Sequence, residues 1–357
     1  MTQSDIAHIR LHNQRLLGEK FQTPHEAVSF LGAVQSQDYP AAKWSLGQRL
    51  KNATDETIDQ AFNKGEILRT HVMRPTWHFV PPSDIHWMLE LTSPRIKQFM
   101  AHYNRKLELD DGLFKKTTAM IVKLLKEKSY ATRQEIKAEL TKIGITTDVQ
   151  RLAHIVSWAE LDAIVCSGPR IGKQFTYALL ADRAPKTKNK TRDEALAELA
   201  KRYFTSHGPA QVKDFSWWSG LTVKDAEEGL NMIKSKLHNE ILDDKTYWFS
   251  KENKINNQKT PKAFLLSIYD EYTIAYKDRS ALGDGRYFEQ LISMGNALTA
   301  VIIIDGEIAG TWKRIIKKNS IEMIIKPLRN FDKKEYEAIH QEEEKYGKFI
   351  GLPVVTK

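Results

Sequence analysis

Two glutamines spaced two residues apart, Gln35 and Gln37, form the most unusual polar pattern in the chain, because they follow an apolar segment. A second polar group lies in residues 69–80, where arginines and histidines occur among apolar residues. Neither group contains a carboxylate pair, a nucleophile with a base, or a set of metal ligands, which most hydrolases need. The available chemistry is therefore a reaction whose leaving group is already activated, or none at all.

The amide of glutamine donates and accepts hydrogen bonds, but it does not titrate. Glutamine therefore cannot act as an ordinary general base, although its amide oxygen can orient a water molecule and stabilise developing positive charge. Asp38, directly after Gln37, is a competing base. The alternative interpretation is that Gln35 and Gln37 are surface residues that cap carbonyl groups at the end of a helix.

Other residues near these two groups are suited to an anionic partner. Arg69 and Arg74 are candidates for phosphate contacts, with structural ion pairs as the alternative. His78 lies among aromatic residues, so it is either a ligand-binding histidine or a core residue. Lys43 is a candidate for contact with a phosphate backbone.

The composition narrows the class of partner. The 357 residues carry a formal net charge of +9, and 41% of them are hydrophobic, which is ample for folded domains. A basic balance of this size favours nucleic acid over a membrane as the partner, although many basic proteins bind no polyanion.

The sequence also limits which metal sites, disulfides and cellular compartments we expect. The single cysteine, Cys166, excludes an internal disulfide, and the eleven histidines show no spacing of the zinc-site type. We therefore expect no metal and no cofactor. The sequence contains no evident signal peptide and no apolar run long enough to span a bilayer, so we expect a cytoplasmic protein.

The elements that would position the glutamines are mainly helical. Pro24 is typical of the first turn of a helix, and this helix would carry Gln35 and Gln37 at its C-terminal end. Pro40 is expected to break that helix. Residues 67–80 alternate enough to predict a strand or a hairpin.

The rest of the chain divides into segments. Residues 111–183 predict three helices followed by two short strands around a loop that contains Arg170 and Lys173, which is the order of a winged helix. We expect both residues, together with Arg133 at the start of the second helix, to contact DNA. The helical pattern recurs after a cationic linker that begins at Ala184.

The predicted fold class is α+β, with tandem winged-helix units and a small C-terminal β-sheet or barrel-like part. The predicted domains are an N-terminal winged-helix-like unit, a second and a third winged helix, and a β-rich region closed by a helix, at residues 1–110, 111–183, 191–260 and 261–357. Asp305 and Gly306 predict a hairpin turn in the last of these.

A series of short motifs runs along nearly the whole chain in a specific order. They are Gln35-Ser36-Gln37, Met73-Arg-Pro-Thr-Trp-His-Phe79, His207-Gly-Pro-Ala-Gln-Val-Lys-Asp-Phe215, Trp218-Ser-Gly220, Tyr269-Asp-Glu-Tyr272, Tyr276-Lys-Asp-Arg279 and Asp305-Gly-Glu-Ile-Ala-Gly-Thr-Trp312. In this order they resemble the winged-helix DNA glycosylases that unhook interstrand cross-links and excise bulky alkylpurines, a family that includes the azinomycin-resistance glycosylase.

The resemblance implies catalysis at a glutamine-x-glutamine motif, so that Gln37 would position a water molecule and Gln35 would hold the deoxyribose or support Gln37. This chain departs from the family pattern in having Ser36 where an apolar residue is usual, and Pro75 where glycine is usual. Both departures bear on substrate range more than on fold.

A glutamine site suits this chemistry, because an N7- or N3-alkylated purine is already cationic and leaves as a neutral base. The resemblance therefore predicts a monofunctional DNA glycosylase that acts on double-stranded DNA, with no lysine nucleophile and no lyase activity. The alternative is a non-catalytic winged-helix DNA-binding protein, such as a transcriptional regulator. Regulators usually dimerise to match palindromic sites, and the absence of an obvious dimerisation helix leads us to expect a monomer.

Overall fold

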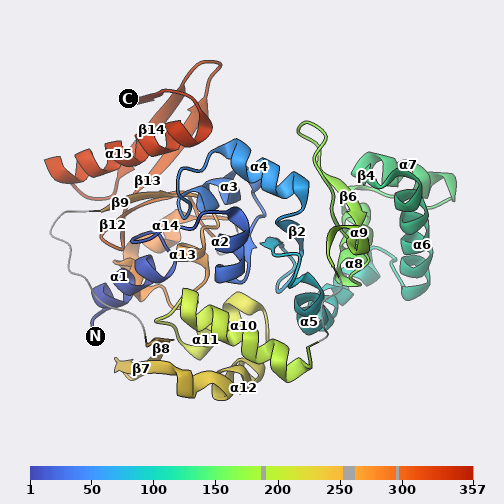
Figure 1. The fold of residues 1–357 in the computed structure, drawn as a ribbon, viewed down its shortest axis with the longest axis horizontal. Coiled ribbons are helices and arrows are strands. Elements are labelled where there is room, and N and C mark those ends of the chain that lie inside the picture. The colour runs from blue at the N-terminus through green and yellow to red at the C-terminus, as the bar shows by residue number, and fades with distance from the viewer. Residues whose placement is uncertain (186–189, 252–261, 295–296, 357) are drawn as a thin grey trace. The chain divides into compact units, whose positions relative to one another are not determined.

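The computed structural model describes residues 1–185, 190–251, 262–294 and 297–356. The chain forms two compact units: unit 1 comprises Met1–Ile58, Ala197–Trp218 and Val223–Lys357, and unit 2 comprises Asp59–Leu196 and Ser219–Thr222. Both units contain helices and strands, so the fold is a mixture of the two, as predicted (Figure 1).

Short helices with well-formed N-terminal caps begin unit 1. The first elements are α1 (Gln3–Asn13), α2 (Pro24–Leu31), β1 (Val34–Gln35), α3 (Tyr39–Gly47) and α4 (Asp55–Lys64), of which α4 continues into unit 2. Thr23 caps α2, because its hydroxyl accepts the Glu26 N–H while the Glu26 side chain accepts the Thr23 N–H. Pro24 occupies the first turn of α2, as the sequence predicts.

A second group of helices in unit 1 ends in a hairpin. Its elements are α10 (Arg192–Ser206), α11 (Val212–Ser219), α12 (Val223–Ile233), the 3-10 turn η1 (Lys234–Lys236), β7 (Leu237–Leu242) and β8 (Lys245–Ser250). β7 and β8 pair antiparallel, and the turn between them holds Asp243 and Asp244 at positive φ. Ala210, between α10 and α11, forms an antiparallel bridge with Trp248 of β8.

A five-stranded sheet completes unit 1, in the order β15-β14-β13-β12-β9. The strands are β9 (Ala263–Leu266), β12 (Val301–Ile304), β13 (Glu307–Ile316), β14 (Ile321–Pro327) and β15 (Val354–Thr356). β14 and β15 are parallel, and the other neighbours are antiparallel. Asp305 and Gly306 join β12 to β13 with φ of 50° and 95°, so the predicted hairpin turn is confirmed.

The helix α15 (Lys333–Ile350) packs against this sheet at β9, and its Tyr346 ring lies 5.4 Å from the Trp312 ring of β13 (Figure 1). Smaller elements connect β9 to β12: α13 (Glu271–Ile274), η2 (Ser280–Leu282), η3 (Gly285–Tyr287), α14 (Phe288–Leu291) and the paired strands β10 (Ile292–Met294) and β11 (Ala297–Leu298).

Unit 2 combines a hairpin with a compact helical core. Its elements are β2 (Leu68–His71), β3 (Trp77–Val80), α5 (Ile85–Lys106), α6 (Asp111–Lys128), β4 (Tyr130–Thr132), α7 (Arg133–Lys142), α8 (Val149–Leu161), β5 (Val165–Ser167), β6 (Thr176–Leu179) and α9 (Leu180–Arg183). β2 and β3 form the hairpin predicted at residues 67–80. The helices α6, α7 and α8 gather around a sheet of order β4-β6-β5 (Figure 1).

A buried ion pair joins segments of unit 1 that are far apart in the sequence. The Arg49 guanidinium donates two hydrogen bonds to the Asp270 carboxylate, at 2.8 and 2.9 Å, and both side chains are fully buried. Ser45 donates a further hydrogen bond to Asp270 at 2.7 Å. Such a two-point contact is among the stronger protein interactions, and it fixes orientation as well as distance.

A hydrogen-bonded chain extends from this pair toward α1 and the end of α10. Arg49 donates to Gln14, Gln14 donates to the Tyr276 hydroxyl, and Tyr276 donates to the main-chain oxygen of His207, at 2.9, 2.9 and 2.7 Å. Because all of these groups are buried, each needs its partner to offset the loss of water.

Arg49→Met is expected to lower the free energy of unfolding by about 3–5 kcal/mol, because it leaves the Asp270 carboxylate buried without its cation. Urea unfolding of the full chain, followed by tryptophan fluorescence, measures this change. Arg286→Met is the matched control, since Arg286 pairs with Asp284 on the surface and its loss should not change the midpoint. Equal urea midpoints for the two variants would contradict the proposed contribution of the Arg49–Asp270 pair to stability.

Candidate active site

The Gln35-Ser36-Gln37 motif lies in the connection between α2 and α3, in unit 1. α2 ends at Leu31, Gln35 is the last residue of β1, and Gln37 precedes the residue that caps α3. The prediction that both glutamines lie at the end of a helix is therefore wrong. The helix stops early because Gly32 follows it with φ of 86°, a conformation that ends a helix.

The three side chains of the motif differ in exposure. Ser36 is fully buried and Gln35 is 7% exposed, whereas Gln37 is exposed. Gln35 therefore packs inside unit 1, whereas Gln37 is accessible to solvent or to a ligand. The burial of Ser36 agrees with the apolar residue that the family resemblance leads one to expect there.

Glu271 holds the motif in place from within unit 1. Its Oε1 accepts a hydrogen bond from the backbone N–H of Gln35 at 2.8 Å, and its Oε2 accepts one from the indole N–H of Trp218 at 2.9 Å. Glu271 and Trp218 are fully buried. Two donors on one buried carboxylate leave Gln35 little freedom, because moving it would strip the carboxylate of a partner.

An aromatic cluster surrounds the same carboxylate. His207 Nε2 lies 3.4 Å from Glu271 Oε2, and the His207 ring stacks on Tyr203 at 5.0 Å between centroids, with Trp218 at 5.2 Å. Burial lowers the pKa of His207, although its contact with Glu271 opposes that shift. A neutral His207 agrees with its full burial, so the hydrogen bonds from Gln35 and Trp218 are the stronger contacts of the Glu271 side chain.

Asp38 serves partly as a structural cap. Its Oδ1 accepts the Ala41 N–H at 2.9 Å and so caps α3, while Pro40 occupies the first turn of that helix. Pro40 therefore helps to begin a helix, and the expectation that it breaks the preceding one is wrong. Asp38 remains exposed beside Gln37.

Tyr269 is a neighbour of Asp38 that sequence reasoning did not single out as a site residue. Burial and the nearby Asp38 charge raise the pKa of Tyr269, so its phenol stays protonated at neutral pH and can donate a hydrogen bond. Tyr269 also has φ of 65°, an uncommon conformation for a residue other than glycine. Tyr269 and Glu271 both belong to the motif Tyr269-Asp-Glu-Tyr272, which was the available sequence signal.

Lys43, the remaining predicted residue in unit 1, is buried within α3. Its ammonium group forms an ion pair with Asp55 at 2.6 Å and lies 5.3 Å from the Tyr39 ring centre. A phosphate would therefore have to replace the Asp55 carboxylate before it could contact Lys43.

Arg69 and His78, in the β2–β3 hairpin of unit 2, are more buried than side chains that bind phosphate at a surface would be. The Arg69 guanidinium lies over the rings of Trp77 and Phe175, at 4.3 and 4.7 Å from their centres, and Arg69 is 8% exposed. His78 is fully buried, with Nδ1 at 2.9 Å from the main-chain oxygen of Thr76. These positions favour packing and orientation roles for both side chains.

Arg74 and Pro75 form the tight turn of the same hairpin. The Arg74 N–H bonds to the Val72 oxygen and the Thr76 N–H bonds to the Arg74 oxygen, both at 2.7 Å. Arg74 is partly exposed and Pro75 is exposed. Because these two turn hydrogen bonds use the N–H groups on either side of Pro75, proline is tolerated where the family usually has glycine.

The remaining predicted DNA contacts also lie in unit 2. Arg133, at the start of α7, donates to the Val149 oxygen at 2.8 Å. Arg170 pairs with Asp59 of α4 at 3.1 Å, whereas Lys173 is exposed in the loop between β5 and β6. Of the two loop residues, Lys173 is the one whose side chain projects outward.

Within the described ranges, no group of three or more histidine, cysteine, aspartate or glutamate side chains is arranged to hold a metal ion. In the same ranges, no helix is both long and apolar enough to cross a membrane.

Comparison with known proteins decides the family. A family model described as DNA glycosylase AlkZ-like matches residues 28–349. The chain belongs to the AlkZ-like DNA glycosylase family. It is 20% identical to the interstrand DNA cross-link repair glycosylase of Streptomyces sahachiroi over 96% of this chain and 95% of that protein.

The fold agrees with this family. The solved structure of the Streptomyces sahachiroi DNA glycosylase AlkZ superposes with a TM-score of 0.82 and 18% identity, over the full length of both chains. The resemblance seen in the sequence motifs is thereby confirmed. For an AlkZ-like DNA glycosylase the partner is DNA, and membership of an enzyme family favours the glycosylase over a transcriptional regulator.

Glu271→Gln is expected to slow base excision at least about tenfold, because an amide would turn its own N–H groups toward Gln35 or Trp218. Single-turnover base release from alkylated duplex DNA measures this rate, with DNA affinity measured by fluorescence anisotropy.

Glu343→Gln is the control for this substitution, since Glu343 is an equally buried glutamate on α15. Unchanged excision by Glu271→Gln, or an equal loss in both variants, would contradict a specific role for Glu271 in holding the motif.

Proposed function

We propose that this AlkZ-like DNA glycosylase is monofunctional, acts as a monomer, and hydrolyses the N-glycosidic bond of cationic N7- or N3-alkylated purines in duplex DNA. Gln37 would be the residue that positions the attacking water, with Gln35 supporting it. The observation that carries this proposal is the exposed Gln37 beside a buried Gln35 whose backbone is held by Glu271.

The proposed reaction needs little from the protein beyond positioning. Water oxygen bonds to C1′ as the glycosidic bond breaks, the bonding electrons neutralise the cationic purine, and a proton passes from the water to solvent. An amide oxygen can hold the water and stabilise positive charge at C1′ without titrating. Asp38 is less suited to act as a base, because its Oδ1 already accepts the Ala41 N–H.

Interstrand cross-links are a second class of substrate that the proposal includes. The name of the Streptomyces sahachiroi relative states cross-link repair for that protein. A cross-link formed through N7 of a purine has the same cationic leaving group as a simple N7 adduct, so the same site could act on both.

Tandem winged-helix units are the scaffold that we propose. The order α6-β4-α7-α8-β5-β6, with a sheet of order β4-β6-β5, supports one such unit at residues 111–183. The order α10-α11-α12-β7-β8, with the Ala210–Trp248 bridge in place of the first strand, supports another at residues 191–260, of which 252–260 lie outside the described residues. Arg133 and Lys173 of unit 2 are then candidates for contact with the DNA backbone, and Arg170 would position the hairpin through Asp59.

Gln37→Ala is expected to lower the rate of N7-methylguanine release by about two orders of magnitude, as loss of one oriented polar group in an active site does. The measurement compares wild type and variant on alkylated duplex DNA at matched occupancy. Gln98→Ala, which removes an exposed glutamine on α5, is the control. Undiminished release by Gln37→Ala would refute the catalytic assignment.

The rate of the chemical step is expected to be flat between about pH 6 and pH 9, since an amide does not titrate. Tyr269 should not make the rate depend on pH in this range. The ordinary pKa of tyrosine already lies above about pH 9, and the pKa of Tyr269 is raised further. Single-turnover rates across this range test the point. A rate that rises with pH and loses that rise in Asp38→Asn would instead make Asp38 the base.

A further inference from the structure

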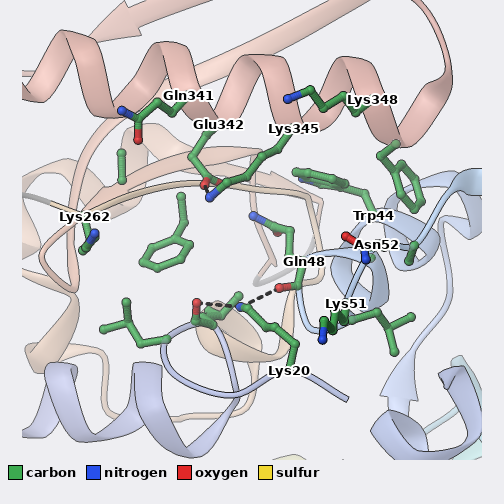
Figure 2. A pocket seen from close by; sticks show the side chains of 18 of the residues that line it. Lys20, Trp44, Gln48, Lys51, Asn52, Lys262, Gln341, Glu342, Lys345 and Lys348 are labelled. Atoms are coloured by element: carbon green, nitrogen blue, oxygen red, sulfur yellow. Dashed lines mark hydrogen bonds and ion pairs between the residues drawn. The ribbon is translucent and has the colours of Figure 1, made fainter. Parts of the chain in front are cut away.

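A cavity of about 740 Å³ lies within unit 1, lined by α15 and by residues at the end of α3 and just after it (Figure 2). α3 begins after Asp38 and ends at Gly47, which lines the cavity. Its nine residues span about 13 Å at the usual helical rise, so cavity and motif are separate places on one rigid element. The volume is that of an ordinary small-molecule site.

Positive charge dominates the described lining of this cavity. Three exposed lysines contribute to it: Lys51 from the loop after α3, Lys262 just before β9, and Lys348 from α15. Lys345 also lines the cavity but pairs with Glu342. Burial lowers the pKa of Lys20 to about 7, and its amine already donates to three main-chain oxygens, so Lys20 adds little charge. Glu342 is the one acidic side chain among the described lining residues. Its charge contributes little, because burial raises the pKa of Glu342 and Lys345 contacts its carboxylate.

The buried side-chain amide of Gln48 lines the cavity. Gln48 is 9% exposed, and Figure 2 shows its side chain between Lys20 below and Glu342 above. Its Oε1 and Nε2 are both buried, and neither forms a hydrogen bond with the described part of the chain. A buried amide oxygen without a donor is costly, so the site is better satisfied when a ligand supplies an N–H group.

Aromatic side chains form the apolar part of the wall. Trp44, Phe264 and Phe349 all line the cavity, from α3, β9 and α15 respectively. A flat ring suits such a wall, since aromatic groups gain from stacked or edge-to-face contact in addition to burial. The site therefore combines cations, an unsatisfied amide acceptor and an aromatic wall.

We propose that this cavity binds a nucleotide unit, with its phosphate attracted by the charges of Lys51 and Lys348, which lie on opposite walls (Figure 2), and its base placed against the aromatic wall near Gln48. An inorganic anion would leave the aromatic wall uncovered, and an uncharged nucleoside would leave the lysines without counter-charge. A fatty acid carries no N–H group for Gln48. A base edge supplies both donors and acceptors, and a lysine binds phosphate as a point charge.

The nucleotide has two sources, a free mononucleotide or the end of a DNA strand. Isothermal titration of the full-length protein with dAMP, and separately with a 5′-phosphorylated single-stranded tetranucleotide, distinguishes them. Inorganic phosphate and deoxyadenosine are the controls for charge alone and base alone. The correct ligand, dAMP or the tetranucleotide, should bind with 1:1 stoichiometry and at least about tenfold more tightly than either control.

Lys51→Glu with Lys348→Glu tests the site itself. We expect this double variant to weaken nucleotide binding at least about tenfold, because each lost charged contact is worth that much. Lys334→Glu is the matched control, since Lys334 is exposed on α15 and does not line the cavity. Thermal unfolding at the wild-type midpoint shows that each variant is folded.

Several results would overturn the proposal. They are failure of both nucleotides to bind, binding of inorganic phosphate as tight as that of the nucleotides, and binding that the double variant leaves unchanged. Base release from alkylated DNA is a separate measurement, so the cavity can fail this test while the glycosylase assignment stands.

Discussion

Two adjacent buried carboxylates, Asp270 and Glu271, are the constraint on which unit 1 depends. Asp270 holds Arg49 through two hydrogen bonds, and Glu271 holds the backbone of Gln35 and the indole of Trp218. Buried charges are tolerated only with partners in good geometry, so these contacts fix the segments that supply them. The N-terminal helices, the end of α11 and α13 are thereby tied together around the motif.

In the proposed mechanism this constraint matters, because a glutamine that only positions water has no other source of catalytic power. A carboxylate or histidine can offset imperfect placement through proton transfer, whereas an amide acts only by position and dipole. Gln37 is exposed, but the chain directly before it is held by Glu271 and the chain directly after it by the Asp38 cap. The exposed residue is thus fixed on both sides, which is the preorganisation that electrostatic stabilisation requires.

Local rules predicted much of the fold. The first turn at Pro24, the hairpin at residues 67–80 and the turn at Asp305 and Gly306 depend on neighbouring residues, and all three are confirmed. The end of α2 was placed too late, because apolar periodicity continues past Gly32 while the backbone does not. In the candidate site, Gln35 and Gln37 can be predicted from a local motif, whereas the contacts of Tyr269 and Glu271 depend on segments distant in the sequence.

The family, the mainly helical start and the motif of groups that do not titrate are all predictable from the sequence, since they follow from residue types and their order. Tertiary structure alone decided that Glu271 supports Gln35, a residue 236 positions earlier in the chain. It also decided that Lys43 pairs with Asp55 and that Arg69 packs between two rings. No local pattern encodes these contacts, because burial and partner choice depend on how distant segments meet.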